Sequence, residues 1–505
     1  MKNKKALRGK KLLAIALCAT IIGTMAGCGN SAEEAPKEQD TVQTPETPAA
    51  QPSEEAEENS SEEAASTEPE ETYDFGGRTF RIGAYYDLTP NPDAGALEAA
   101  LAERVKYVED NYNCKIEFVD LGGDYVADYV TSVLAGDPCV DIGYVVTTKL
   151  LPSLIEGGIA YPVSQLDTID LSEYKWKSAV TEAGEYKGGQ YAFLVKDPDI
   201  RYGIFWNKTL FEKNGLPDLY ELAENGEWTW EKFQEIASQG NQDTDNDGTI
   251  DIYGFNAREN LAWCYLYSNG AYVGEKTDSG IKINLNDPKV EEALTALQNF
   301  SQNVDYRDTI DWSVESWDSF IKDFRDGKYM MCLEEFWISY SYLNSEEGGM
   351  TDDWGWVPFP KGPSADDWSC YGKESGARFI LNGVENPEEV AQVYDLLTDI
   401  ADSDEEWDEF MEDKLDNWCD DAQTKDWVTY INDSGVMAIN GVMGFSDLND
   451  SINEMIGAVT SGEMTPATAL ETYQSAIDAA LADLENHDYN AEMQEYEIEE
   501  ETASE

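Results

Sequence analysis

RTFRIGAYY, at residues 78–86, alternates apolar and polar side chains with the period of two that a β-strand requires. The next segment, ALEAALAERVKYVEDN (96–111), spaces its apolar residues as a helix does, and KIEFV (115–119) reads again as a strand. YVADYVTSVLA (125–135) then predicts a second helix, and VDIGYVV (140–146) predicts a third strand. Strands that alternate with helices in this way are typical of βαβ units, so the sequence predicts an α/β fold with mainly parallel sheets.

The alternation resumes after Tyr191 and continues to the C-terminal region. A threonine stands just before two of the later helices, as Thr229 and Thr465, where its hydroxyl is expected to cap the helix. The chain has 505 residues, of which 41% are hydrophobic, so its length is compatible with two to four domains that each have a core. The later helical patterns are 230–239, 288–302, 387–399 and 466–485.

The composition excludes several classes of function. With 34 Lys and Arg against 102 Asp and Glu, the net charge is −68, and phosphate backbones bind to clustered cations, so nucleic acid is not expected as a partner. The single histidine, His487, argues against His-ligated metal catalysis and against a His-dependent triad. Six cysteines beyond residue 100 lack the CxxC spacing of zinc or redox motifs; they can be buried thiols or can pair in disulfides.

The N-terminal region has the pattern of an export signal followed by a tether. Residues 1–27 combine a basic start with an apolar run that is too short to span a membrane, and Met25-Ala26-Gly27-Cys28 resembles the bacterial lipobox. That resemblance implies cleavage before Cys28 and fatty acyl chains, palmitate among them, on this residue; an ordinary signal peptide with an incidental cysteine is the alternative. Residues 28–72 would then be the lipidated cysteine and a disordered acidic tether, because 31–72 contain almost no aliphatic side chains.

Six segments, taken in order, resemble landmarks of the family 1 extracellular solute-binding proteins. The resemblance extends over about 340 residues and implies a two-lobed fold like that of type II periplasmic binding proteins, in which each lobe is a mixed, mainly parallel sheet flanked by helices. It places lobe one at 73–193 with 376–435 and lobe two at 194–375 with 436–505, joined by hinge crossings. The segments are LAGDPCVDIGYV (134–145), YGIFWNKTLFEKNGL (202–216), GEWTWEKFQEIA (226–237), FRDGKYMMCLEEFW (324–337), WVPFPKGP (356–363) and VTSGEMTPATALE (459–471).

The resemblance also implies a function. The protein would be a monomeric lipoprotein on the outer face of the cell membrane, held there by its lipid alone, that binds an oligosaccharide between its lobes and delivers it to the permease of an ABC importer. It would have no catalytic residues. One alternative is a surface hydrolase that uses paired carboxylates such as Glu334 and Glu335, although neighbours on a strand point apart. A sensor or adhesin on the same fold is the other, and neighbouring genes would separate it from an importer.

A sugar site needs aromatic faces for the rings and polar groups for the hydroxyls. Trp337 matches the position where sugar-binding members of the family often place a stacking aromatic residue, and Glu335 lies beside it. By resemblance Trp263 is also near the cleft, although core packing is the alternative for both tryptophans and is preferred for Trp228, Trp230, Trp354 and Trp356. The other predicted ligand residues are Tyr85, Asp87, Thr147, Thr148 and Asp199, and for those of lobe one an ordinary solvated loop is the alternative.

DTDNDGTID, at residues 243–251, resembles the calcium loop of an EF-hand. Oxygen-bearing residues alternate around a glycine at loop position 6, which suits a hard cation with six to eight oxygen ligands. Position 12 holds Gly254 where an EF-hand has a bidentate glutamate, and an acidic surface turn is the alternative. A structural Ca²⁺ is therefore expected, with no other cofactor, and its predicted ligands are Asp243, Asp245, Asp247, Thr249 and Asp251.

Overall fold

The computed structural model describes residues 73–494 and 496, apart from 259, 278–279, 345–347, 435–436 and 485. These residues belong to one compact unit of the chain. The predicted signal, the lipidation site at Cys28 and the acidic tether lie outside the described residues. Within the described part of the chain, none of the helices has both the length and the apolar character that crossing a membrane requires.

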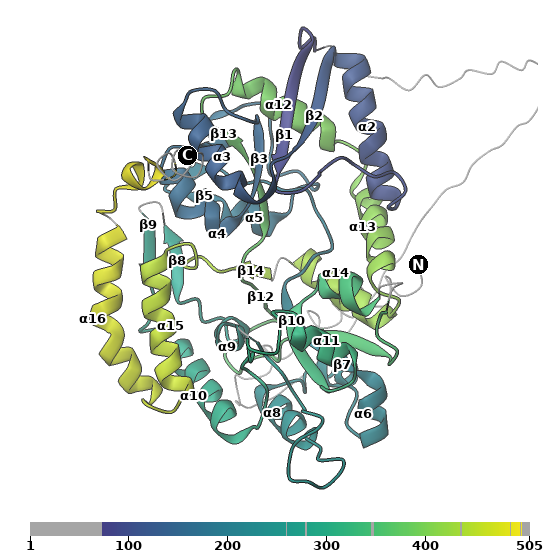
Figure 1. The fold of residues 1–505 in the computed structure, drawn as a ribbon, viewed down its shortest axis with the longest axis vertical. Coiled ribbons are helices and arrows are strands. Elements are labelled where there is room, and N and C mark those ends of the chain that lie inside the picture. Colours follow the sequence, from purple (N-terminus) through teal and green to yellow (C-terminus); the bar gives the residue numbers. More distant parts are fainter. Residues whose placement is uncertain are drawn as a thin grey trace, which may run out of the picture. The chain divides into compact units, whose positions relative to one another are not determined.

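The first sheet, here sheet 1, is built around β1 (Arg78–Ala84). β1 pairs in parallel with β2 (Cys114–Asp120) on one side and with β3 (Ile142–Val146) on the other. The strand β13 (Gly376–Leu381) comes from much later in the chain and pairs antiparallel between β3 and β4 (Ala160–Tyr161). Sheet 1 is therefore a mixed sheet whose order is β2-β1-β3-β13-β4 (Figure 1).

The second sheet, here sheet 2, is built around β7 (Tyr202–Asn207), whose six residues are all buried. β10 (Met331–Glu335) and β11 (Trp354–Pro358) pair antiparallel with it. β12 (Cys370–Gly372) connects β7 to β14 (Met437–Ile439). Full burial explains why the β7 sequence, YGIFWN, is a continuous run of mostly apolar residues and does not alternate.

Helices cover both sheets. The chain also forms two short antiparallel hairpins, β5 (Glu185–Tyr186) with β6 (Gly189–Gln190) and β8 (Gly274–Thr277) with β9 (Gly280–Ile283). The α-helices are α2 (Ala96–Tyr112), α3 (Tyr125–Leu134), α4 (Thr147–Lys149), α5 (Ser178–Ala183), α6 (Lys208–Asn214), α7 (Leu219–Glu224), α8 (Trp230–Gln239), α9 (Leu261–Ser268), α10 (Pro288–Asn303), α11 (Ser319–Arg325), α12 (Pro387–Thr398), α13 (Asp404–Trp418), α14 (Ala422–Ser434), α15 (Ser446–Thr460) and α16 (Pro466–Leu484). The shorter helical turns are η1 (Gly122–Asp124), η2 (Leu150–Leu154), η3 (Val163–Gln165) and η4 (Ser339–Leu343).

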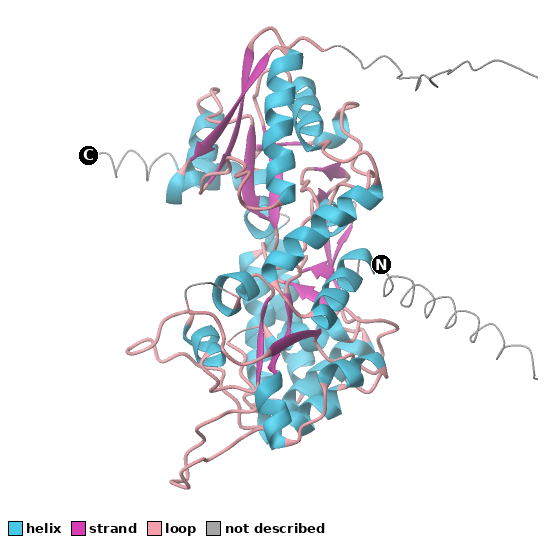
Figure 2. Cartoon of the chain, turned by 90° about the vertical axis from the view of Figure 1, so that its right-hand side faces the viewer, coloured by secondary structure: helices cyan, strands magenta, loops and turns pink. Residues whose placement is uncertain are grey.

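The chain passes between the two sheets three times, after β6, between β12 and β13, and between β13 and β14. Figure 2 shows the two groups of strands one above the other, with helices around each. The helices α13 and α14 lie along one side of these passages in Figure 1, and the β8–β9 hairpin lies on the other. The lobe boundaries expected from the sequence stay a prediction.

The elements confirm an α/β fold with mixed sheets flanked by helices, and most of the predicted bounds differ by one or two residues from those observed. The prediction of mainly parallel sheets is wrong for sheet 2, where β7 pairs antiparallel with β10, β11 and β12. The alternation of helices and strands in a sequence does not determine the direction in which strands from distant parts of the chain pair. The Thr229 hydroxyl accepts a hydrogen bond from the Lys232 backbone N–H at 3.3 Å, as the predicted cap requires. Trp228, Trp230 and Trp356 are buried, and Trp354 is half-buried against the core of sheet 2, which confirms the packing prediction for these four. The six cysteines of the described residues are free thiols.

Candidate ligand-binding site

Aromatic side chains gather where β1 and β3 of sheet 1 end. Tyr85 and Tyr86, directly after β1, have ring centroids 4.7 Å apart and are 46% and 41% exposed. Their rings pack on Tyr144 of β3, and Tyr85 also packs on Tyr125 of α3. The carboxyl ends of parallel strands are where α/β sheets bind ligands. These four residues are called the tyrosine face below.

An arginine lies behind the tyrosine face. The guanidinium of Arg378, on β13, is 4.9 Å from the centroid of the Tyr144 ring, and its Nε and Nη1 atoms are buried without a hydrogen-bond partner among the described residues. Burial raises the pKa of Tyr86, although the positive charge of Arg378 acts against this shift. The Tyr86 hydroxyl therefore stays protonated and can donate a hydrogen bond at neutral pH.

On sheet 2, three of the predicted residues meet around Arg201. The Arg201 guanidinium donates to Asp199 at 3.1 Å and to Glu335 at 3.0 Å, and the other oxygen of Glu335 accepts from the Trp337 indole N–H at 2.7 Å. Burial alone would lower the pKa of Arg201, but the charges of Glu335 and Asp199 raise it well above its usual value. The network fixes the Trp337 ring, which is half-buried, in one orientation.

Two further aromatic contacts surround this network. Trp337 packs against Trp317 and Tyr342, with ring centroids 6.3 and 6.0 Å apart. Tyr340, which is 42% exposed, lies on Trp418 at the end of α13, with centroids 4.6 Å apart. Sheet 2 thus presents aromatic groups beside an ion network, whereas the tyrosine face of sheet 1 lies beside the single guanidinium of Arg378.

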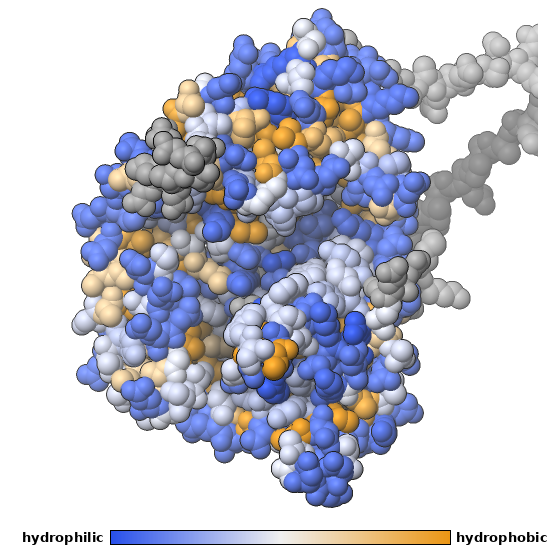
Figure 3. All heavy atoms as spheres, in the orientation of Figure 1, coloured by the Kyte–Doolittle hydropathy of each residue, from blue (hydrophilic) through white to orange (hydrophobic). Residues whose placement is uncertain are grey.

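Electrostatic effects connect the groups on the two sheets. Burial raises the pKa of Tyr340, and the charges of Asp199 and Asp197 and the neighbouring Tyr86 add to the shift. Asp197 also adds to the raised pKa of Tyr86, so both tyrosines lie close to the segment that joins the sheets. Figure 3 shows that the face of the molecule is hollowed between the elements of sheet 1 and those of sheet 2. We call the surface between the tyrosine face and the Trp337 network the aromatic cleft.

The remaining predicted ligand residues lie elsewhere. Asp87 is exposed and accepts a hydrogen bond from the Thr89 backbone N–H, so it shapes its own loop. Thr147 is buried and accepts from the Ser375 backbone, while Thr148 donates to Glu374 at 2.6 Å. Trp263 is 5% exposed and stacks on Tyr371 at 6.2 Å, which favours the packing alternative for this residue.

Sequence reasoning missed Tyr86, Tyr340, Trp418 and Arg378. The doublet Tyr85-Tyr86 could have drawn attention to Tyr86, because it directly follows the carboxyl end of β1. The Tyr340–Trp418 contact joins residues 78 positions apart, and neither residue lies in a motif.

The structure also contains a cavity of about 850 Å³ on the side of the β8–β9 hairpin. Its walls include Tyr186, Tyr267, Tyr272, Lys276 and Trp368, and none of the predicted ligand residues. Thr147 and Thr148 line a small neighbouring pocket that shares Lys276 with it. The Lys276 ammonium donates to the carbonyl oxygens of Glu182 and Ala183 at the end of α5, and so it links the hairpin to the elements near sheet 1.

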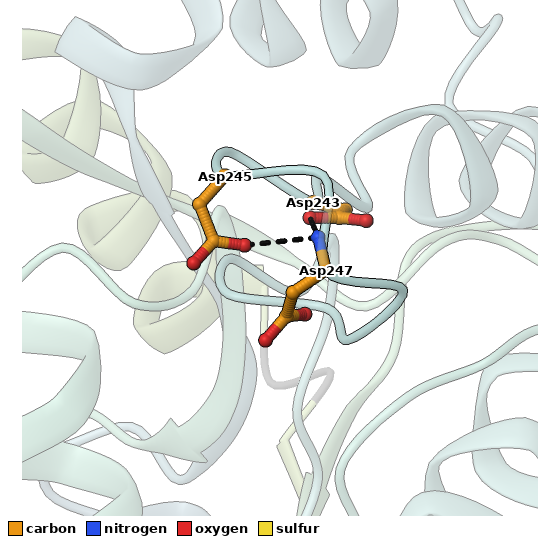
Figure 4. Close-up of side chains that lie close together, drawn as sticks. All are labelled: Asp243, Asp245 and Asp247. Atoms are coloured by element: carbon orange, nitrogen blue, oxygen red, sulfur yellow. Dashed lines mark hydrogen bonds between the residues drawn. The ribbon is translucent and has the colours of Figure 1, made fainter.

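Three of the five predicted calcium ligands converge. One carboxylate oxygen from each of Asp243, Asp245 and Asp247 lies within 4.8 Å of the others (Figure 4). Asp243 accepts from the Gly248 backbone N–H at 2.8 Å, and Gly248 has a φ of 92°, which glycine adopts without strain. Asp251 instead accepts from the Thr244 backbone N–H at 2.8 Å. Three exposed carboxylates this close together fit a hard cation with oxygen ligands.

The chain is similar to known proteins both in sequence, over one family model, and in fold. A family model described as bacterial extracellular solute-binding protein matches residues 89–402. The cyclic alpha-maltosyl-1,6-maltose binding protein from Arthrobacter globiformis superposes with a TM-score of 0.58 at 16% identity, over 81% of this chain and all of that one. No curated protein sequence matches the chain.

Two other solved structures resemble it as well. A cyclo/maltodextrin-binding protein complexed with maltotetraose has a TM-score of 0.57 at 14% identity, over 79% of this chain and 96% of that one. An ABC substrate-binding protein from Listeria monocytogenes in complex with cycloalternan has a TM-score of 0.53 at 17% identity, over 80% of this chain and 99% of that one. At these identities the likeness shows a shared two-lobed fold.

Lys276 gives a prediction for the dependence of stability on pH. Burial lowers its pKa from 10.5 to about 8. Between these two values the unfolded chain holds a proton that the folded chain has released, so this group makes folding more favourable as the pH rises through that range. We expect the difference in unfolding free energy between the wild type and Lys276→Met to grow in favour of the wild type between pH 7.5 and pH 9.5, measured by urea unfolding. Equal changes in the unfolding free energy of both proteins over that pH range would contradict the lowered pKa of Lys276.

Proposed function

The chain belongs to the family of bacterial extracellular solute-binding proteins, and we propose that its solute is an oligosaccharide, bound in the aromatic cleft and passed to the membrane subunits of an ABC importer. Membership of the family makes it an extracytoplasmic binding protein. The three similar proteins described above bind oligosaccharides, which supports a sugar as the solute here.

The observation that carries the proposal is the fixed position of Trp337. Its indole N–H donates to Glu335, and Glu335 accepts from Arg201, so the ring cannot turn without breaking a charged network. A sugar ring has one face rich in C–H groups, which packs on an aromatic ring, and hydroxyls that need polar partners. Asp199 and the hydroxyl groups of the tyrosine face can form hydrogen bonds with the hydroxyl groups of the sugar.

We propose that binding is accompanied by closure of the two lobes. The three passages between the sheets are a small number of connections, which suits a hinge motion around a ligand. In that state the tyrosine face and the Trp337 network would enclose the sugar from both sides, and the permease would recognise the closed form.

Binding without catalysis is part of the proposal. The adjacent carboxylates Glu334 and Glu335 have separate partners: Glu334 is buried and lies 3.5 Å from Arg258, while Glu335 contacts Arg201. A glycosidase needs two carboxyl groups on either side of one bond, about 5–9 Å apart, with one able to give a proton. Two neighbours that face different arginines do not offer this arrangement.

The first test replaces the stacking residue. Trp337→Ala should lower the affinity for a bound oligosaccharide about tenfold or more, because one aromatic face and its fixed orientation are lost. Isothermal titration of the full-length protein with maltotetraose, mannotriose and cycloalternan measures the effect, and Trp337→Tyr, which keeps a ring, should retain more of the affinity.

The same samples separate the alternatives. Sugar recovered intact after prolonged incubation supports binding, whereas cleaved sugar would support the hydrolase. A wild-type protein that binds none of a broad panel of oligosaccharides would refute the proposal. A large drop in the melting temperature of sugar-free Trp337→Ala would show that this residue belongs to the core.

We also propose that residues 243–251 bind a structural Ca²⁺. The three converging carboxylates and the glycine turn support this, and the missing position-12 glutamate limits the affinity to the weak range of extracellular modules, with Kd about 10⁻⁴ to 10⁻³ M. Calcium at about 100 times Kd should then stabilise the fold by about 2.7 kcal/mol. A calcium-dependent rise in melting temperature that disappears in Asp245→Asn is expected; no rise in the wild type would remove the proposal.

Finally, we propose that Cys28 carries the lipid that holds the protein on the outer face of the membrane. The lipobox-like sequence before it supports this, and two or more acyl chains are enough for stable anchoring. In cells, Cys28→Ser should move the protein from the membrane fraction to the medium or the soluble extract. If the variant sediments with membranes as the wild type does, the anchor is elsewhere.

A further inference from the structure

The loop between α10 and α11 carries exposed aromatic residues that the proposed site does not use. Trp312 is 71% exposed, Trp317 is 46% exposed, and Val314 between them is 82% exposed. Large apolar side chains that cluster on one exposed segment are typical of a surface that binds a ligand or a partner. The loop lies at residues 307–318.

This loop has a well-defined conformation. At the first residue of the loop, the Arg307 carbonyl oxygen accepts a hydrogen bond from the Ala257 backbone N–H at 2.9 Å. The Arg307 side chain donates to Glu315 at 2.7 Å. Glu315 accepts a second bond from the Asp311 backbone N–H at 2.6 Å. At the other end the Tyr342 hydroxyl donates to Asp318 at 3.0 Å. The indoles are therefore held by an ordered backbone, which reduces the entropy lost when a ligand binds.

The surface is continuous with Trp337. The Trp317 ring lies 6.3 Å from that of Trp337 at an angle of 38°, and 6.4 Å from Tyr342 at 88°. Trp317 thus contacts the residue that is proposed to stack on a sugar ring, and Trp312 precedes Trp317 on the same exposed loop. A ligand that begins on Trp337 can continue onto Trp317 only if it is longer than the inner site.

We infer that Trp317 and Trp312 form an outer sugar-binding surface that continues from Trp337, and that through it the protein selects long, uncharged oligosaccharides over short ones. This inference rests on the proposed function. Indole faces accept sugar rings of many types. The loop also holds four carboxylates against one arginine, which disfavours anionic glycans.

The experiment compares a disaccharide with a hexasaccharide of the same linkage. Maltose with maltohexaose, and mannobiose with mannohexaose, are titrated calorimetrically into the full-length wild type and into Trp312→Ala. We expect Trp312→Ala to lose about fivefold to tenfold in affinity for the hexasaccharide, the scale of one stacked aromatic contact, and to bind the disaccharide as the wild type does. Because Trp312 is mostly exposed, its replacement should leave the melting temperature unchanged.

Three matched variants separate stacking from other roles of the loop. Trp312→Tyr should keep most of the affinity for the hexasaccharide, while Trp312→Leu should lose as much as Trp312→Ala, because leucine is apolar but has no ring. Val314→Ala, on the same exposed loop, should change neither affinity. Unchanged hexasaccharide binding in Trp312→Ala, or equal losses for both sugars, overturns the inference while leaving the proposed function intact. A wild type that binds no sugar of either length refutes both.

Discussion

The strand β13 is the constraint on which the arrangement of the molecule depends. It lies in the sequence between β12 and β14, which are both strands of sheet 2, yet it inserts between β3 and β4 and completes sheet 1. Neither sheet can therefore form from one continuous piece of the chain. The two bodies are joined by the same segments that bring Arg378 behind the tyrosine face and Glu374 to Thr148.

Charged side chains are buried next to the segments that join the two sheets, and this burial explains why Asp199, Arg201 and Glu335 form an ion network. Asp199 has its pKa raised, with burial as the largest cause, and Arg201 and Lys177 oppose this shift. Two carboxylates around one guanidinium pay part of their desolvation cost through mutual attraction, but each would be strongly destabilising without the arginine. The network is thus less a source of stability than a means of fixing Trp337, since the indole N–H takes the remaining oxygen of Glu335.

The sequence was informative where structure is local. The period of two in β1, the helical spacing of α2 and the Thr229 cap depend on neighbours within a few residues, and all were predicted. The antiparallel entry of β13 into sheet 1 was not predicted, because strand pairing over more than 200 residues leaves no periodic pattern. For the site, composition suggested aromatic and acidic ligands, and the family resemblance suggested Trp337. The Tyr340–Trp418 contact depends on tertiary packing alone, and Trp263 is buried because helix α9 is buried almost all round.

The charge of the chain connects these observations with the chemistry of the ligand. Of the −68 total, residues 73–505 carry −61, so the folded part is itself strongly acidic. Such a field repels anions and leaves neutral polyols unaffected, because a sugar without charge has no net interaction with it. Beside Trp337, however, Arg201 locally balances the carboxylates of Asp199 and Glu335. Paired charges beside exposed aromatic rings, set in a strongly acidic surface, thus support the proposal that the ligand is uncharged and is recognised by stacking and hydrogen bonding.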